Sequence, residues 1–261
     1  MAQTPLVPAE FLTKFWRALI EFHMIEENDK ILIGLSGGKD SMFMTAALAE
    51  IQRHAPVNFS LVCYTVDTMF SSNFPAEELS TFCHKYGLEH YHEQVNVEEV
   101  WQHRGNTPCF SCAYFRRAAT NRKALELGCN KVALAHHNDD AVGTFLLNLI
   151  HSGQLKTFLP CTYLTRTGLT VLRPLLYYRE SEIIAYGKSL GLKPLKNPCP
   201  YDGHTERQEM KTLIETLKKT DADIYNHLAS AMRPGDTQEL WPAKPHQDQM
   251  IKLFRAFWQK K

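Results

Sequence analysis

A glycine-rich hexapeptide near the start of the chain has the residue types that bind phosphate. It consists of Ser36, Gly37, Gly38, Lys39, Asp40 and Ser41. It follows an apolar run at 31–35 and leads into a helical pattern that ends near 54. Adjacent glycines let the backbone approach phosphate oxygens, and a helix N-terminus adds amide donors and a positive dipole. The Walker A spacing GxxxxGK[ST] is absent, so we expect a different kind of nucleotide-phosphate site.

Three cysteines have a sequence context that indicates metal chemistry. Cys109 and Cys112 form a CxxC motif just ahead of a predicted helix, and Cys199 lies between two prolines. A CxxC alone is compatible with a redox pair, half of a zinc site or part of an iron–sulfur site. Three thiolates from two loops would suit a 4Fe–4S cluster with one open iron. The remaining four of the seven cysteines have no ligand spacing and are expected to be small buried side chains or incidental thiols.

Acids and histidines follow two predicted strands. Asp67 ends the strand predicted over 59–66, where it would either contact a nucleotide or close a turn. The motif His136-His137-Asn138-Asp139-Asp140 follows the strand predicted over 131–135. Asp139 and Asp140 could interact favourably with the dipole of a helix whose N-cap is Asn138. Alternatively, one of them could hold a Mg²⁺ that bridges ATP phosphates. His136 and its neighbour could be satisfied core residues or contact a ligand.

The elements that position these residues alternate between strand and helix. Strands are predicted over 31–35, 59–66, 88–95, 131–135 and 169–172, with a loop over 153–168. Helices are predicted over 9–25, from the hexapeptide to 54, over 75–87, from the CxxC to Gly128, after Asp140 and over 180–190. This order predicts an α/β protein with a doubly wound parallel sheet. We divide the chain into an N-terminal helical segment (1–27), a nucleotide-binding domain that carries the cysteines (28–200) and a helical C-terminal extension (201–261).

Composition limits the cell compartment and the partners. The chain has 261 residues, of which 44% are hydrophobic, enough for a substantial core. It contains no apolar run of about 20 residues and no signal-peptide pattern, so we expect a cytoplasmic protein without membrane association. The net charge is +1, but the stretches 100–125 and 141–179 contain basic residues and no acid. These stretches could be solvated faces, although their closeness to the candidate motifs favours an anionic partner.

Four motifs in a fixed order give the chain a family resemblance. The segments IEENDKILIGLSGGKDS, CFSCAYFRRAA, KVALAHHNDDAVGTFLLNL and LRPLLYYRESEI resemble the tRNA 2-thiocytidine synthetase (TtcA) family of PP-loop ATP pyrophosphatases. The likeness covers about residues 10–210. It implies the adenine nucleotide alpha hydrolase-like fold of PP-loop domains.

The resemblance also implies an activity and a set of partners. The enzyme would use ATP, with Mg²⁺, to adenylate the C2 oxygen of cytidine 32 in the anticodon loop of tRNA. Sulfur would then replace that oxygen, and AMP would leave. The resemblance implies that Ser36 to Ser41 bind ATP and that Cys109, Cys112 and Cys199 hold a 4Fe–4S cluster. Within this site we predict Lys39 and Asp40 as the catalytic residues, and Asp67, His136, Asp139 and Asp140 as further nucleotide-binding residues. The sulfur donor would be a protein such as a cysteine desulfurase. The sequence leaves the oligomeric state open, with a homodimer as one candidate. Alternatives are another tRNA base, a small thiolated metabolite, or a cluster-independent adenylating ligase.

Overall fold

The computed structural model describes residues 6–70, 74–96, 108–195, 206–233 and 246–258. Within this part of the chain, six strands form one sheet in the order β3-β2-β1-β4-β6-β5. The strands are β1 (Asp29–Gly34), β2 (Phe59–Asp67), β3 (Glu89–Gln94), β4 (Lys131–Ala133), β5 (Cys161–Leu164) and β6 (Leu169–Leu172). Neighbouring strands are parallel except β5, which pairs antiparallel with β6.

The sheet confirms the predicted doubly wound α/β fold and corrects one part of it. The stretch 153–168, expected to be a loop, contains β5, which pairs with β6 from Cys161 opposite Leu172 to Leu164 opposite Leu169. A four-residue strand at a sheet edge has too few residues for a clear alternating pattern, and its pairing with β6 defines it.

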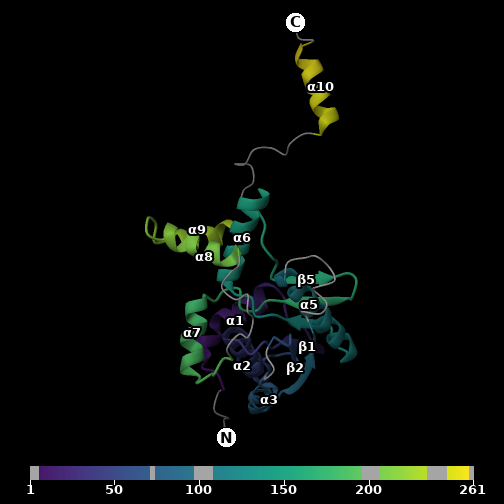
Figure 1. Ribbon diagram of the computed structural model, residues 1–261, viewed down its shortest axis with the longest axis vertical. Coiled ribbons are helices and arrows are strands. Elements are labelled where there is room, and N and C mark those ends of the chain that lie inside the picture. The colour runs from purple at the N-terminus through teal and green to yellow at the C-terminus, as the bar shows by residue number, and fades with distance from the viewer. Residues whose placement is uncertain (1–5, 71–73, 97–107, 196–205, 234–245, 259–261) are drawn as a thin grey trace.

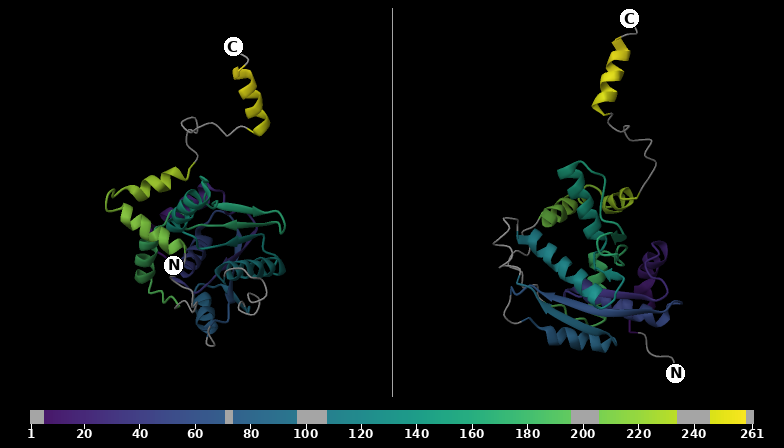
Figure 2. Two further views of the ribbon diagram at one scale, coloured as in Figure 1. Left: turned by 45° about the horizontal axis from the view of Figure 1, so that its top comes forward. Right: turned by 90° about the vertical axis from the view of Figure 1, so that its right-hand side faces the viewer.

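Helices cover both faces of the sheet (Figures 1 and 2). They are α1 (Ala9–Glu21), α2 (Lys39–His54), α3 (Ala76–Lys85), α5 (Pro108–Glu126), α6 (Asn138–Ser152), α7 (Glu180–Ser189), α8 (Glu206–Leu217), α9 (Ile224–Ala231) and α10 (Gln247–Trp258). Ile31 and Ile33 of β1 point into the core formed with α1, α2, α3 and α7. Leu32 points to the other face, where it packs in a cluster with Ala124 of α5. This alternation follows from the twofold side-chain period of a strand.

The first helix is part of the main core. Its side chains Leu12, Phe15, Ala18 and Leu19 are buried along one face. The Tyr178 hydroxyl donates to the Phe11 carbonyl at 2.6 Å and accepts the Phe15 amide at 3.0 Å. The helix ends at Glu21, before the predicted 25, because the chain turns at His23 with a positive φ of 47°.

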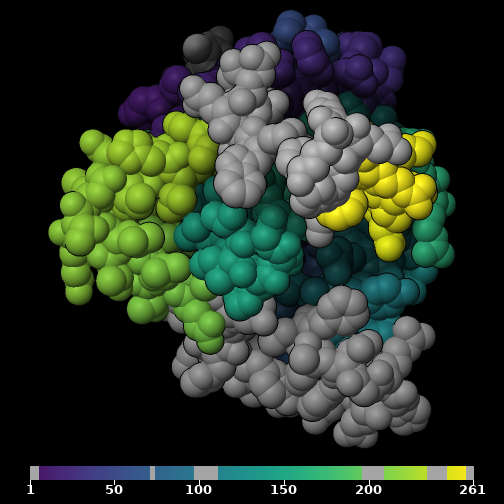
Figure 3. Space-filling model, turned by 90° about the horizontal axis from the view of Figure 1, so that it is seen from above, coloured from purple at the N-terminus to yellow at the C-terminus, as the bar shows by residue number. Residues whose placement is uncertain are grey.

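The C-terminal helices differ in how they contact the rest of the molecule. α8 and α9 pack on α6 through a cluster of Val142, Leu146, Met210, Ile214 and Tyr225. Seen from above, they form the surface beside α6 (Figure 3). α10 lies apart from the sheet and its helices (Figure 1). No helix in the described ranges is both long and apolar enough to cross a membrane.

The strand order reverses between β1 and β4. α2 and α3 follow β1 and β2 on one face, whereas α5 leads to β4 across the other face. The chain therefore changes direction between β1 and β4, and in such sheets ligands bind at the carboxyl ends of the strands beside this point. The hexapeptide and the His136–Asp140 motif follow these two parallel strands, so the fold brings both motifs to the same edge of the sheet.

Candidate active site

Hydrogen bonds between the two serines close the hexapeptide loop. Ser41 Oγ accepts the Ser36 amide at 3.2 Å and donates to the Gly38 carbonyl at 3.0 Å. Ser36 Oγ lies 3.1 Å from Ser41 Oγ and accepts the Gly38 amide at 3.3 Å. Gly37 has φ of +77°, a backbone conformation that favours glycine. α2 then starts at Lys39, and no described side chain caps it, so its first amides can face an anion.

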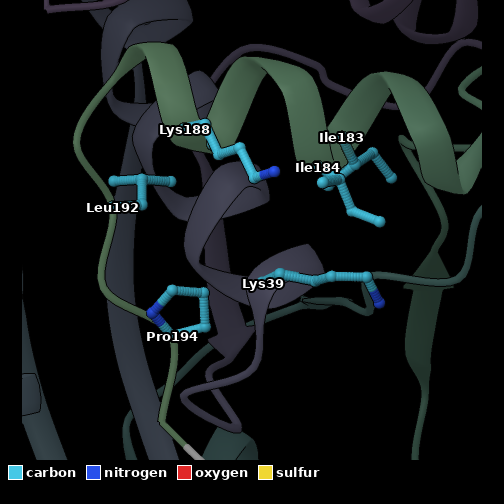
Figure 4. Close-up of a pocket in the computed structure, with 7 residues that line it drawn as sticks. Lys39, Ile183, Ile184, Lys188, Leu192 and Pro194 are labelled. Atoms are coloured by element: carbon cyan, nitrogen blue, oxygen red, sulfur yellow. The ribbon is translucent and has the colours of Figure 1, made fainter.

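Lys39 is held at the edge of this loop by two carboxylates. Its Nζ lies 3.1 Å from Asp40 Oδ2 and 2.9 Å from Glu180 Oε1, at the start of α7. Burial acts to lower the pKa of Lys39, but the hydrogen bonds and charges of Glu180 and Asp40 outweigh it and raise this pKa. Beside the Lys39 side chain, the turn after α7 leaves a mainly apolar cavity of about 160 Å³ (Figure 4). Lys39 is thus kept charged and is held in place at the edge of the loop.

The motif after β4 meets the loop through a buried histidine. His137 Nε2 lies 3.9 Å from Asp40 Oδ1 and 3.6 Å from Asp140 Oδ2. Asp140 accepts the His137 amide at 3.0 Å. The N-cap of α6 is therefore His137, one residue before the predicted Asn138, whose side chain instead donates to the Leu176 carbonyl at 2.8 Å. Asp40 Oδ1 is buried without a hydrogen-bond partner among the described residues, so it can accept from a bound group.

Asp139 binds the start of α7. Its carboxylate accepts the Glu180 amide at 2.8 Å and Arg179 Nη2 at 3.2 Å. No role for Arg179 or Glu180 was predicted from the sequence, although both lie in the segment LRPLLYYRESEI. An arginine and a glutamate at the start of a predicted helix were the available signal, but nothing in the sequence indicated which residues they contact.

Two further predicted residues stay close to this edge of the sheet. Asp67 is buried at the end of β2, and its carboxylate accepts the Met69 amide at 2.8 Å, which is the role of a turn aspartate. The ring of His136 packs at 5.2 Å from that of Phe158. Contact of either residue with a nucleotide remains a prediction.

The structure describes the cysteine site only in part. The CxxC lies within the first two turns of α5, which begins at Pro108, and so is not ahead of the helix as predicted. The Cys112 side chain is half-buried. The Cys109 side chain and all of Cys199 lie outside the described residues. Within the described part, no three histidine, cysteine or acidic side chains are grouped to hold a metal ion.

The fold and the loop define a class of protein, an α/β nucleotide-binding domain with its phosphate loop at the switch point of the sheet. The model of the PP-loop domain matches residues 11–217. The chain is 36% identical over 219 residues to the tRNA-cytidine(32) 2-sulfurtransferase of Ralstonia pickettii, covering 82% of this chain and 69% of the relative. It is 33% identical over 221 residues to the enzyme of that name from Geobacter metallireducens, covering 83% and 86%.

A solved structure shares the fold. The U34-tRNA thiolase NcsA from Methanococcus maripaludis, solved with its [4Fe-4S] cluster, matches with a TM-score of 0.69 at 24% identity, covering 85% of this chain and 77% of that one. The chain therefore belongs to the PP-loop family and, within it, to the tRNA-cytidine(32) 2-sulfurtransferases. The predicted family and fold class are confirmed.

Proposed function

We propose that this protein is an ATP-dependent, iron–sulfur-dependent sulfurtransferase that replaces the C2 oxygen of cytidine 32 in tRNA by sulfur. Membership of the family supports the enzyme class and the tRNA substrate. The phosphate loop at the switch point supports the use of ATP. The C2 oxygen of cytidine is a poor leaving group, and adenylation turns it into AMP, which leaves readily.

One backbone hydrogen bond carries the proposal furthest. The Leu195 amide donates to the Gly37 carbonyl at 2.9 Å, so the chain that leads to Cys199 is attached to the phosphate loop. Four residues of chain can span at most about 14 Å, which limits the distance from Leu195 to Cys199. α5 runs antiparallel to the strands, so its start, with Cys112, lies at the same edge of the sheet. Cys112 and the segment that leads toward Cys199 therefore start at the edge of the sheet that carries the nucleotide site, which supports the proposal that the three thiolates act beside ATP.

The chain's own residues have separate roles in the ATP step. Hexapeptide amides and Lys39 would bind the phosphates and stabilise the charge that grows on departing pyrophosphate. Asp40 Oδ1, buried and unpartnered among the described residues, fits a Mg²⁺ ligand, and phosphate oxygens and water would complete the coordination. We propose Asp40 rather than Asp139 for this role, because Asp139 already binds Arg179 and the Glu180 amide.

The three cysteines fit an iron–sulfur cluster by their chemistry. Thiolates are the ligands that such clusters prefer, and three of them leave one metal position open. When bound, the cluster would supply the position at which sulfur is delivered to C2. A sulfur donor such as a cysteine desulfurase and a homodimer remain predictions.

The decisive experiment measures iron and acid-labile sulfide on protein purified without oxygen, and 2-thiocytidine in tRNA after reaction with ATP. We expect about four of each per chain, lost in Cys199→Ala. Cys161→Ala is the matched control, because Cys161 is a half-buried thiol in β5 and should leave the cluster intact. If the unsubstituted protein contains no iron and still cleaves ATP, the cluster assignment is wrong and the protein is an adenylating ligase. If the protein contains iron but does not thiolate tRNA, the assignment of tRNA as the substrate is wrong.

A further inference from the structure

Glu180 joins the phosphate loop to a C-terminal helix. One of its oxygens, Oε1, lies 2.9 Å from Lys39 Nζ in the loop, and the other, Oε2, lies 2.9 Å from Lys211 Nζ in α8. Burial alone would raise the pKa of Glu180, but hydrogen bonds from Lys211 and Lys39 outweigh it and lower this pKa to about 2. Glu180 is thus charged at neutral pH and bridges two lysines from distant parts of the chain.

The bridge leaves Lys39 able to act on a phosphate. An ammonium group has three N–H donors, and Asp40 and Glu180 accept two of them. In Figure 4 the Lys39 side chain extends along α7 and away from Pro194. A long lysine side chain that is already fixed loses less conformational entropy when its third donor meets a ligand. Glu180 therefore limits where the charge of Lys39 can lie.

A second link runs beside the first. Arg179, which binds Asp139, also lies over the ring of Tyr225 in α9, with Cζ 3.1 Å from the ring centre. Tyr225 is buried in the cluster that holds α8 and α9 on α6. Adjacent residues at the start of α7 thus contact one helix each of the C-terminal pair, and each also contacts a site segment.

We propose that Glu180 is a positioning residue for Lys39 and that Lys211 of α8 holds Glu180 in place, so that the α8–α9 pair sets the geometry of the phosphate loop. This inference rests on the proposed role of Lys39 at the ATP phosphates. An ordinary surface ion pair would contribute little to activity. Here the carboxylate is shared by two cations, and its side chain is 28% exposed.

The test compares four variants in tRNA-dependent pyrophosphate release from ATP. Glu180→Gln keeps the shape and removes the charge, and we expect kcat to fall about 10- to 100-fold, with the KM for ATP changing less than about threefold. Lys211→Met should lower kcat in the same direction but less, and Lys211→Arg, which keeps the charge, should restore it. Lys218→Met is the matched control: Lys218 follows α8 and pairs with Glu215, away from the loop.

The double variant separates positioning from general destabilisation. If Lys211 acts through Glu180, Glu180→Gln/Lys211→Met should be no slower than Glu180→Gln alone. Independent, multiplying effects, or equal effects of Lys211→Met and Lys218→Met, would overturn the inference. Lys211 is 45% exposed, so its substitution should not prevent folding even if Glu180→Gln does. Lys39→Ala separates the proposed function from the positioning role. If Lys39→Ala stays active, the loop is not the ATP site and the proposed function fails. If Lys39→Ala is inactive while Glu180→Gln and Lys211→Met are fully active, only the positioning role of Glu180 fails.

Discussion

Asp139 and Arg179 form a two-sided contact between α6 and the start of α7. Arg179 Nε lies 3.3 Å from each oxygen of the Asp139 carboxylate, and Nη2 lies 3.2 Å from Oδ1. The Glu180 amide donates to Oδ2 at 2.8 Å. Charge-assisted contacts of this kind are stronger than neutral hydrogen bonds. The first acid of the His136–Asp140 motif therefore has a structural role that accounts for its place at a helix start.

We expect Asp139→Asn to lower the free energy of unfolding by about 1–3 kcal/mol, because it weakens this contact and leaves Arg179 without its partner charge. Urea denaturation monitored by circular dichroism measures the change. Asp40→Asn is the comparison: it should cost less stability and instead raise the Mg²⁺ concentration needed for pyrophosphate release. A fully stable Asp139→Asn with a raised Mg²⁺ requirement would show that Asp139, and not Asp40, is the metal ligand.

Sequence reasoning succeeded where the signal is local. The hexapeptide was predictable because an apolar strand, two glycines and a helix start are adjacent in the chain, and the structure gives Gly37 the positive φ that such a turn needs. The doubly wound sheet was predictable because strands alternate with helices and the connections are short. Asp67 was predicted to be either a turn residue or a ligand, and its bond to the Met69 amide supports the turn.

The parts that sequence reasoning missed depend on contacts between distant residues. Glu180 is remote in sequence from Lys39, and only the packing of α7 against α2 brings them together. β5 is defined by its pairing with β6 more than by its own pattern. The N-cap of α6 is His137 and not the predicted Asn138, because the Asn138 side chain donates to the Leu176 carbonyl. No helix-capping rule can anticipate such a competing partner.

Gly37→Ala should disable the loop. A Cβ at this residue would lie 2.6 Å from Leu195 Cδ1, and the φ of +77° is strained for alanine. We expect a loss of about 1–3 kcal/mol in the free energy of unfolding and a fall of at least about tenfold in pyrophosphate release. Gly143→Ala is the matched control, because Gly143 lies inside α6 with no atom within 4 Å of the added Cβ, and it should be neutral or stabilising. Equal effects of the two substitutions would contradict a special role for Gly37.

Lys39→Ala should lower turnover strongly while the fold persists. The loss of one cation that stabilises departing pyrophosphate costs about 10²- to 10³-fold in kcat. Far-ultraviolet circular dichroism should be unchanged, because the Lys39 side chain is 32% exposed and outside the main core. Lys188→Ala is the control, since Lys188 lines the same cavity from α7 but lies outside the hexapeptide (Figure 4). Normal pyrophosphate release by Lys39→Ala would exclude the loop as the ATP site.

His90 of β3 is part of a hydrogen-bond chain that ends at the phosphate loop. The Thr65 hydroxyl donates to the carbonyl of Leu35, the residue before the loop, at 2.7 Å. Thr65 Oγ1 must therefore accept from His90 Nε2, 2.8 Å away. His90 Nδ1 then accepts from the Ser80 hydroxyl at 2.8 Å, so the neutral ring fits and a second ring proton does not.

This arrangement predicts acid sensitivity. Burial, with the nearby charges of His92 and His84, lowers the pKa of His90 from 6.5 to about 4. The unfolded chain takes up a proton as pH falls below 6.5 and the folded chain does not, so this stability is complete above pH 6.5 and is lost as pH falls toward 4. We expect about 1–2 kcal/mol, allowing for partial exposure of the ring. In urea denaturation at pH 7.5 and 5, His90→Gln should reduce the parent's loss of stability, and an equal loss in both proteins would mean that His90 is not the titrating group.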